Sequence, residues 1–289
     1  MKLYLTCSLL FAVLGLSLNS SAESIKMGKN EYRLPDKLLA EALRRGGRYD
    51  LSFSFQDLEY VELSTILAQV ENRDIDIFKT LTTQEYEQRF RPIRIPLYRG
   101  LLGMRIGIVK RENENLFKNV GSLGDMKHFS AGSGRFWADT DILESNGIPV
   151  TKELKYTNMF RMLEAERFDF FPRGVHEPWS EVVREASLNL TVEKSLMLYY
   201  KVPFYYFVHK NNKVLADHIT EQFESMIADG TFVRFFYENE EIKAALEKSN
   251  IASRKVLRLD NPTLPEKTPV DRAELWFSPE EQYLTQNDL

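Results

Sequence analysis

Short apolar segments alternate along the chain with longer amphipathic ones. Apolar residues from Leu38 to Leu43 repeat at helical spacing between Pro35 and Gly46, which predicts a helix. Residues 49–55 alternate as a strand. Further helices are expected at 61–70, 136–146, 156–166, 175–186, 214–228 and 240–249, and further strands at 74–78, 128–131, 168–171 and 256–259. This order of elements is typical of the α/β class.

Two long extended stretches interrupt the alternation. Residues 93–110 contain one proline and three glycines, and residues 196–209 are rich in aromatic side chains. We interpret both as crossovers between two lobes. Lobe 1 is then discontinuous. The expected division is lobe 1 at 25–95 plus 205–260, lobe 2 at 100–200, and a C-terminal strap and tail at 261–289.

Residues 1–22 have the features of a cleaved secretory signal peptide. Lys2 supplies the positive start, residues 9–18 are apolar, and small residues end the segment at Ala22. A membrane anchor is the alternative, but the apolar run has only about half of the roughly 20 residues that a spanning helix needs. We therefore expect export and a periplasmic location.

The charge balance and the metal-binding residue types exclude several functions. The formal net charge is −4, from 38 Lys+Arg and 42 Asp+Glu, which argues against nucleic acid as the main partner. The one cysteine, Cys7, lies in the expected signal, so no intrachain disulfide is possible. None of the four histidines are three or four residues apart, so no helix-spaced metal pair exists. We expect no metal and no cofactor.

Four stretches together resemble a known family. They are the Asp74–Ile77 strand followed by TLTTQEYEQR, the segment 120–126, the segment SAGSGRFWAD, and the segment EAERFDFFPRG. Their order and spacing are similar to those of the periplasmic solute-binding proteins of the amino-acid type (family 3), which have the type 2 periplasmic-binding fold. The resemblance implies two α/β lobes, joined by two extended hinge crossovers, that close on a small ligand.

The chain also departs from that family. The amino-acid binders carry the pattern T-x-x-R, whose arginine holds the ligand carboxylate. In this chain the same register places Tyr86 three residues after Thr83. Tyr86 and Thr82 are therefore candidate ligand residues. The departure indicates a divergent branch.

Two segments of lobe 2 supply charged or polar candidates for holding a carboxylate. Ser133, Gly134 and Arg135 are expected in a loop before a helix, where free amides, a hydroxyl and the positive helix end favour an anion. A plain glycine turn is the alternative. Arg173 has a planar guanidinium suited to a carboxylate, or it forms a salt bridge with a residue such as Glu177, which is itself a candidate.

Aromatic residues near the expected strand ends complete the candidate site. Trp137, Tyr86, Tyr32 and Phe78 are placed to stack against an organic ligand. Packing in the core is the alternative for each of them.

These observations predict an exported binding protein that closes on a small polar or anionic, carboxylate-bearing organic ligand for uptake by an ABC transporter. A sensory or adaptor module that presents its ligand to a membrane receptor is the alternative. A hydrolytic enzyme ranks third, because no spacing singles out an acid–base pair. We expect a monomer.

Overall fold

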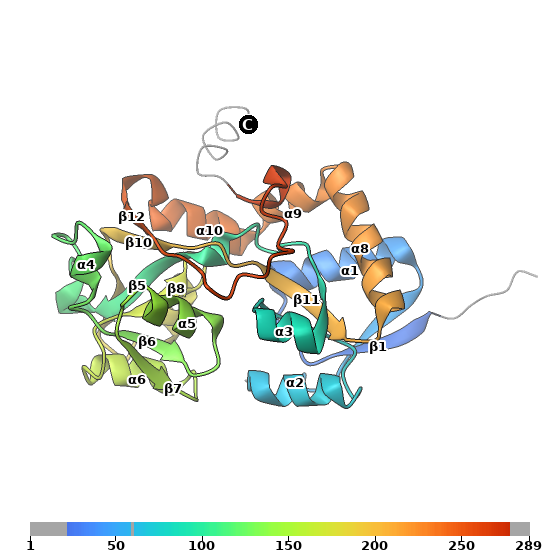
Figure 1. The fold of residues 1–289 in the computed structure, drawn as a ribbon, viewed down its shortest axis with the longest axis horizontal. Coiled ribbons are helices and arrows are strands. Elements are labelled where there is room, and N and C mark those ends of the chain that lie inside the picture. Colours follow the sequence, from blue (N-terminus) through green and yellow to red (C-terminus); the bar gives the residue numbers. More distant parts are fainter. Residues whose placement is uncertain (1–21, 59–60, 278–289) are drawn as a thin grey trace, which may run out of the picture.

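The computed structural model describes residues 22–58 and 61–277. The expected signal peptide up to residue 21 and the last part of the expected tail, from residue 278, lie outside the described residues. Figure 1 shows two lobes side by side, each built around its own sheet, as the sequence predicts. Among the helices described, none is both long enough and apolar enough to cross a membrane.

Lobe 1 is built on a five-stranded sheet in the order β2-β1-β3-β11-β4. Its strands are β1 (Glu23–Met27), β2 (Tyr49–Phe53), β3 (Ile77–Leu81), β4 (Phe90–Ile93) and β11 (Phe204–His209). Strand β1 runs parallel to β2 and β3, whereas β11 is antiparallel to β3 and β4. Residues of β11 alternate between two apolar clusters, so both faces of this sheet are buried.

Helices cover both faces of that sheet. They are α1 (Leu34–Gly46), α2 (Leu63–Glu71), α3 (Gln84–Arg89), α8 (Lys213–Ala228) and α9 (Thr231–Glu238). Helix α1 has Pro35 in its first turn, as predicted, and ends at Gly46. Gly47 follows in the left-handed conformation, and its amide donates to Leu43 O. Helices α1, α8 and α9 share one cluster with β1, while α2 packs in the other. Helix α9 was not predicted.

Lobe 2 contains a sheet in the order β12-β10-β5-β8, with β9 also paired to β5, and a separate parallel pair of β6 and β7. Its strands are β5 (Met104–Lys110), β6 (Ala131–Gly134), β7 (Val150–Glu153), β8 (Phe171–Gly174), β9 (Leu190–Val192), β10 (Leu196–Tyr199) and β12 (Lys255–Arg258). Its helices are α4 (Leu123–Met126), α5 (Ala138–Ser145), α6 (Asn158–Glu164) and α7 (Pro178–Arg184), and α10 (Glu240–Ser249) leads into β12. A single bridge between Ala131 and Phe170 joins the two sheets.

The two predicted crossovers lie against each other between the lobes. Residues 94–103 connect β4 to β5, with a short 3-10 turn (η1, Leu101–Gly103) at the end, and residues 200–203 connect β10 to β11. The amide of Tyr200 donates to Gly103 O at 3.0 Å. The two hinge segments are therefore hydrogen-bonded neighbours.

The C-terminal part of the chain crosses between the lobes again. Strand β12 pairs in parallel with β10 of lobe 2, although the sequence places residues up to 260 in lobe 1. An apolar strand pattern does not say which sheet edge it joins, so the sequence could not place it. From β12 the chain returns past the hinge, where the Asn261 side chain donates to Lys201 O and the amide of Phe277 donates to Arg99 O (Figure 1).

Strands β6 and β8 begin later than predicted, and this corrects the expectation of a free loop at residues 132–134. The Phe168 ring lies 2.4–2.6 Å from where a Cβ on Gly132 would stand, and the Trp137 ring 2.5–2.6 Å from that of Gly134. The glycines therefore belong to a strand covered by large rings. Their neighbourhood is hydrogen-bonded internally, since Gly132 N donates to Phe170 O and Arg135 N donates to Glu153 O.

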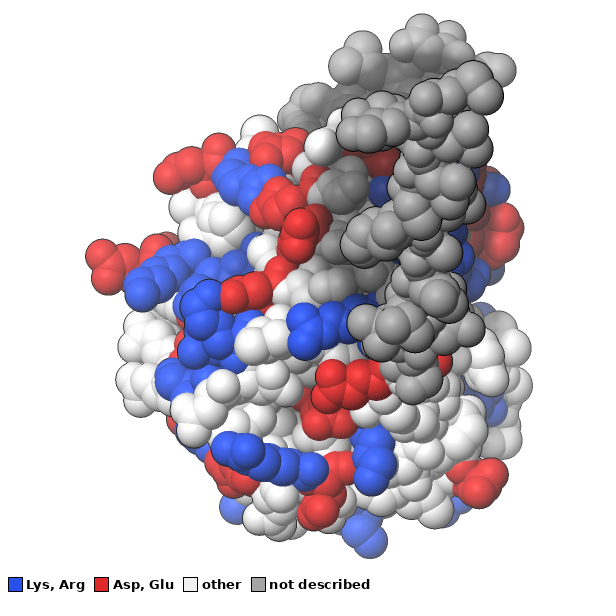
Figure 2. All heavy atoms as spheres, turned by 90° about the vertical axis from the view of Figure 1, so that its right-hand side faces the viewer, with Lys and Arg blue, Asp and Glu red and all other residues white. Residues whose placement is uncertain are grey.

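The surface of lobe 1 carries both signs of charge. Figure 2 shows Lys and Arg interspersed with Asp and Glu over the part of this face that is drawn in colour. This mixing fits the small formal net charge of −4.

Replacing Gly103 by alanine is expected to destabilise the hinge. A Cβ there would stand 2.0 Å from Tyr200 O, which is a backbone atom and cannot rotate away. We expect Gly103→Ala to lower the free energy of unfolding by about 2 kcal/mol, measured by urea unfolding. Gly124→Ala is the control, because its Cβ would meet only Ser122 Oγ, at 3.4 Å. Equal stability of the two variants would contradict the close approach of the crossovers.

Candidate functional site between the lobes

The predicted ligand clamp, Arg173, is neutralised by the chain's own carboxylates. Its Nε lies 2.9 and 3.1 Å from the two oxygens of Glu181, and its Nη2 lies 2.8 Å from Glu181 Oε1 and 2.7 Å from Glu177 Oε1. The residue is only 7% exposed. Of the two interpretations left open by the sequence, the geometry is that of the salt bridge, with Glu181 as an additional partner.

Aromatic rings enclose the same guanidinium. Its central carbon lies 4.9, 5.4 and 5.5 Å from the ring centres of Phe171, Trp137 and Tyr156. Trp137 is half-buried and stacks on Phe171, with a centroid distance of 6.2 Å. The Arg173 guanidinium therefore packs against the Trp137 ring through a cation–π contact.

A second buried arginine shares Glu177. Arg105 Nη1 lies 3.2 Å from Glu177 Oε2, and its Nη2 lies 2.6 Å from Asp139 Oδ1. Its Nε donates to the Tyr200 hydroxyl at 3.0 Å, and that hydroxyl also bonds Asp139. Burial raises the pKa of Glu177, but Arg173, Arg105 and Arg33 more than offset this and hold it below its ordinary value.

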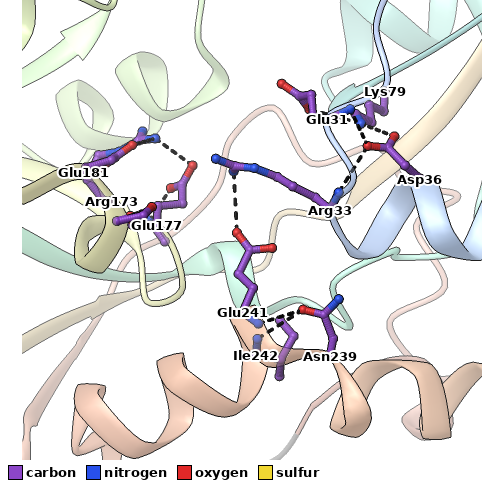
Figure 3. A network of polar contacts seen from close by, with 12 residues as sticks. Glu31, Arg33, Asp36, Lys79, Arg173, Glu177, Glu181, Asn239, Glu241 and Ile242 are labelled. Atoms are coloured by element: carbon purple, nitrogen blue, oxygen red, sulfur yellow. Dashed lines mark hydrogen bonds and ion pairs between the residues drawn. The ribbon is translucent and has the colours of Figure 1, made fainter. Parts of the chain in front are cut away.

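Charged groups of lobe 1 face this network across the interlobe space (Figure 3). Lys79, on β3, is paired with Asp36 and lies 3.1 Å from Glu31 Oε2. Arg33, at the start of α1, lies 3.6 Å from Glu241 Oε1 on α10. Sequence reasoning singled out none of these groups, nor Arg105.

One signal in the sequence did point to Arg105. It is a charged residue between apolar neighbours in strand β5, whose other charged residue, Lys110, stands at the strand's end, and a buried charge needs a partner from elsewhere in the fold. The sequence does not identify the partners, because Asp139 and Glu177 come from distant parts of the chain.

Four predicted ligand residues do not line the interlobe cavity described below. The Ser133 hydroxyl is 1% exposed and lies 2.8 Å from Thr140 Oγ1. Thr82 is fully buried and donates to Glu87, and Phe78 is 2% exposed against Phe90. Tyr32 is 70% exposed. Phe78 therefore packs in the core, which was the alternative interpretation of this residue.

A cavity of about 470 Å³ lies between the lobes. Lobe 1 lines it with α2 and α3, lobe 2 with residues 135–138 and Asp141, and the C-terminal segment with Thr263. Three predicted residues line it, namely Tyr86, Arg135 and Trp137. The Tyr86 hydroxyl donates to Phe136 O at 3.1 Å, so this side chain joins the two lobes directly.

The charges of this cavity are unevenly paired. Arg89 lies 2.8 Å from both Glu71 and Glu85. Arg135 and Asp141 form no ion pair within residues 22–58 and 61–277, and both are exposed. Burial raises the pKa of Tyr86, so its phenol is neutral at pH 7. The cavity therefore offers one unpaired cation and one unpaired anion beside aromatic walls.

His176 is a neutral buried group next to the charge network. It is 3% exposed and stacks on Tyr98, with a centroid distance of 4.4 Å. Burial lowers its pKa well below 6.5, and Arg33, Arg105 and Arg173 lower it further. Its Nδ1 has no hydrogen-bond partner in the part of the chain that the structure describes.

Removing the charge of Glu181 is expected to cost much of the stability of lobe 2. Glu181→Gln leaves the buried guanidinium of Arg173 short of a counter-charge, so we expect a loss of about 3 kcal/mol in urea unfolding. Glu164→Gln is the matched control on the exposed end of α6 and should change stability by less than about 0.5 kcal/mol. Similar losses for both variants would show that Arg173 does not depend on Glu181.

His176 is expected to make the fold sensitive to mild acid. Below pH 6.5 the unfolded chain gains a proton at this residue that the folded chain does not, so stability falls as the pH falls. His176→Phe keeps the stacking and removes this titration. Its loss of stability between pH 7 and pH 5.5 should be about 1 kcal/mol smaller than that of the wild type. An identical pH dependence would contradict the buried neutral state.

Comparison with known proteins places the fold. No protein-family profile and no curated protein sequence matches the chain. An ancestral arginine-binding protein bound to arginine aligns with a TM-score of 0.56 and 17% identity, over 75% of this chain and 98% of that one. The probable extracellular binding protein of an amino-acid ABC transporter from Bacillus subtilis aligns with a TM-score of 0.57 and 16% identity, over 77% and 100% of the two chains.

A different kind of protein shares the same architecture. A histidine kinase sensor domain with similarity to periplasmic binding proteins aligns with a TM-score of 0.57 and 12% identity, over 76% of this chain and 96% of that one. At such identities the likeness concerns the fold. The chain thus has the two-lobed fold of the type 2 periplasmic-binding proteins, with a divergent sequence.

Proposed function

We propose that this protein is an exported solute-binding protein that closes on a small, carboxylate-bearing organic ligand and delivers it to an ABC transporter. The observation that carries this proposal is the cavity of about 470 Å³ lined by both lobes. Its volume lies in the range of small-molecule sites. A ligand that contacts both lobes stabilises the arrangement in which the two lobes are closed around it.

The chemistry of the cavity favours an amino-acid-like ligand. Arg135 offers an unpaired guanidinium for a carboxylate, and Asp141 offers an unpaired carboxylate for an ammonium group. Trp137 and Tyr86 supply aromatic contact area for the body of the ligand. In this proposal the anchor of the carboxylate is Arg135, because Arg173 is occupied by Glu177 and Glu181.

The similar structures support binding and transport as the role. The Bacillus subtilis protein is described as part of an amino-acid ABC transporter, and a second similar protein as the substrate-binding protein of one. A periplasmic location and a role without catalysis follow by analogy. The sensor domain supports the alternative, in which the closed protein contacts a membrane receptor. Ligand-dependent cross-linking to a receptor in place of a transporter would favour that alternative.

Arg135 is the residue that tests this proposal. We expect the wild type to bind at least one compound in a panel of amino acids, dipeptides and dicarboxylic acids in isothermal titration. Arg135→Ala should weaken that binding at least about tenfold, because a charge-assisted contact is lost. Arg161→Ala, on the exposed side of α6, is the matched control and should bind as the wild type does. Unchanged binding by Arg135→Ala would remove this cavity as the site.

A further inference from the structure

The chain after β12 makes a short connection between the two lobes. Strand β12 pairs with β10 of lobe 2, and just after it the amide of Leu259 donates to Tyr199 O at 2.8 Å. Four residues later, the carbonyl of Thr263 accepts a hydrogen bond from the amide of Gln84, the first residue of α3 in lobe 1, at 3.2 Å. Figure 1 shows this segment running from lobe 2 toward lobe 1. We call residues 260–263 the interlobe tie.

Asn146 attaches the tie to lobe 2. This residue follows the last turn of α5. Its Nδ2 donates to Asp260 O at 2.8 Å, and its Oδ1 accepts from the amide of Asp260 at 3.0 Å. One side chain therefore holds both backbone polar groups of Asp260. Both bonds are exposed to solvent, so water replaces them when they break.

Asn261 holds the tie in a turn beside the hinge. Its Nδ2 donates to Lys201 O on the second crossover at 2.9 Å. Its Oδ1 accepts from the amide and from the hydroxyl of Thr263, each at 2.9 Å. Thr263 lines the solute cavity. Asn261 is therefore a positioning residue for the part of the cavity wall that the C-terminal segment supplies.

Beyond the tie, the chain is attached to lobe 1 a second time. Arg272 pairs with both carboxylate oxygens of Glu224 on α8, at 2.6 and 2.9 Å. Leu275 is fully buried, and the amide of Phe277 donates to Arg99 O at 2.7 Å. The tie thus lies between an anchor in lobe 2, formed by β12, and an anchor on lobe 1 that begins at Arg272.

The length of the tie limits how far the lobes separate at this point. The chain from Asp260 to Thr263 spans at most about 11 Å when it is extended. With the tie released at both ends, the free chain runs from Leu259 to Arg272 and reaches about 45 Å. Release therefore supplies the slack that opening requires, while β12 and the anchor on α8 stay folded.

We propose that the interlobe tie is a releasable restraint, and that the two lobes separate fully only after it leaves Asn146 or loses its turn at Asn261. The hinge segments are hydrogen-bonded at Gly103 and Tyr200, which permits rotation about that contact. A further attachment at the cavity wall opposes this rotation. The inference goes beyond the proposed function, because it concerns opening with or without a ligand.

Distances between spin labels test the restraint without any ligand. Cys7 is the only cysteine of the sequence, so Cys7→Ser combined with Thr65→Cys on α2 and Glu164→Cys on α6 gives one labelled position on each lobe. Both positions are exposed. We expect one main distance in pulsed electron double resonance. Asn261→Ala in this background should raise the population at longer distance at least about tenfold, because the hydrogen bonds of the turn are lost.

Two further changes separate the contacts of the tie from its length. Asn146→Ala removes the attachment to lobe 2 and should raise the long-distance population to a similar extent. Inserting Gly-Ser-Gly-Ser-Gly-Ser after Asp260 keeps these side chains but adds about 20 Å of slack, and it should act in the same direction. Asn119→Ala, at an exposed position of lobe 2, is the matched control and should leave the distances unchanged. Thermal melting by circular dichroism identifies the variants that are folded.

The restraint is overturned by any of three results. These are unchanged distances in every folded variant of the tie, an equal rise in Asn119→Ala, or a parent protein that already shows the longer distance to the same extent as the variants. A lower melting temperature with unchanged distances would mean that the segment only stabilises the fold. Because no solute is added, failure of the tie and failure of the proposed solute cavity are distinguishable.

Discussion

The need to neutralise two buried arginines governs the middle of this molecule. Arg105 and Arg173 are 3% and 7% exposed, and a buried charge without partners is too costly for a fold to keep. Asp139 of α5, Glu177 just before α7 and Glu181 of α7 supply the partners. These contacts position α5 and α7 against β5 and β8, and they fix the Trp137 ring over Arg173.

The pairing of Arg173 also changes which residue can bind a ligand carboxylate. An arginine saturated by two glutamates is not available to a carboxylate ligand, whereas Arg135, which forms no ion pair with a described residue, lines the cavity. Tyr86 lines the same cavity with a neutral phenol that donates to Phe136 O. Contact between the lobes is thus made by the chain's own side chains at several points.

Additional chain crossings reinforce this contact. The hinge segments touch at Gly103 and Tyr200, and the chain crosses again through α10 into β12 and back through residues 259–277. Trp276 covers Gly100 on the first crossover, and Leu275 is fully buried in an apolar cluster to which both lobes contribute. Each crossing restricts the motion of one lobe relative to the other, so opening must be absorbed by few backbone positions.

The sequence by itself determined the α/β class, the helices with a continuous apolar face such as α1, and the two crossovers, because these depend on local periodicity and on breakers. It also identified Tyr86, Arg135 and Trp137, which line one cavity. Only the tertiary structure decided the pairing of Arg173 with Glu181, the partner sheet of β12 and the approach of Arg33 to Glu241. Such contacts join residues distant in the chain, and the free energy of a buried charge depends on neighbours that no local pattern specifies.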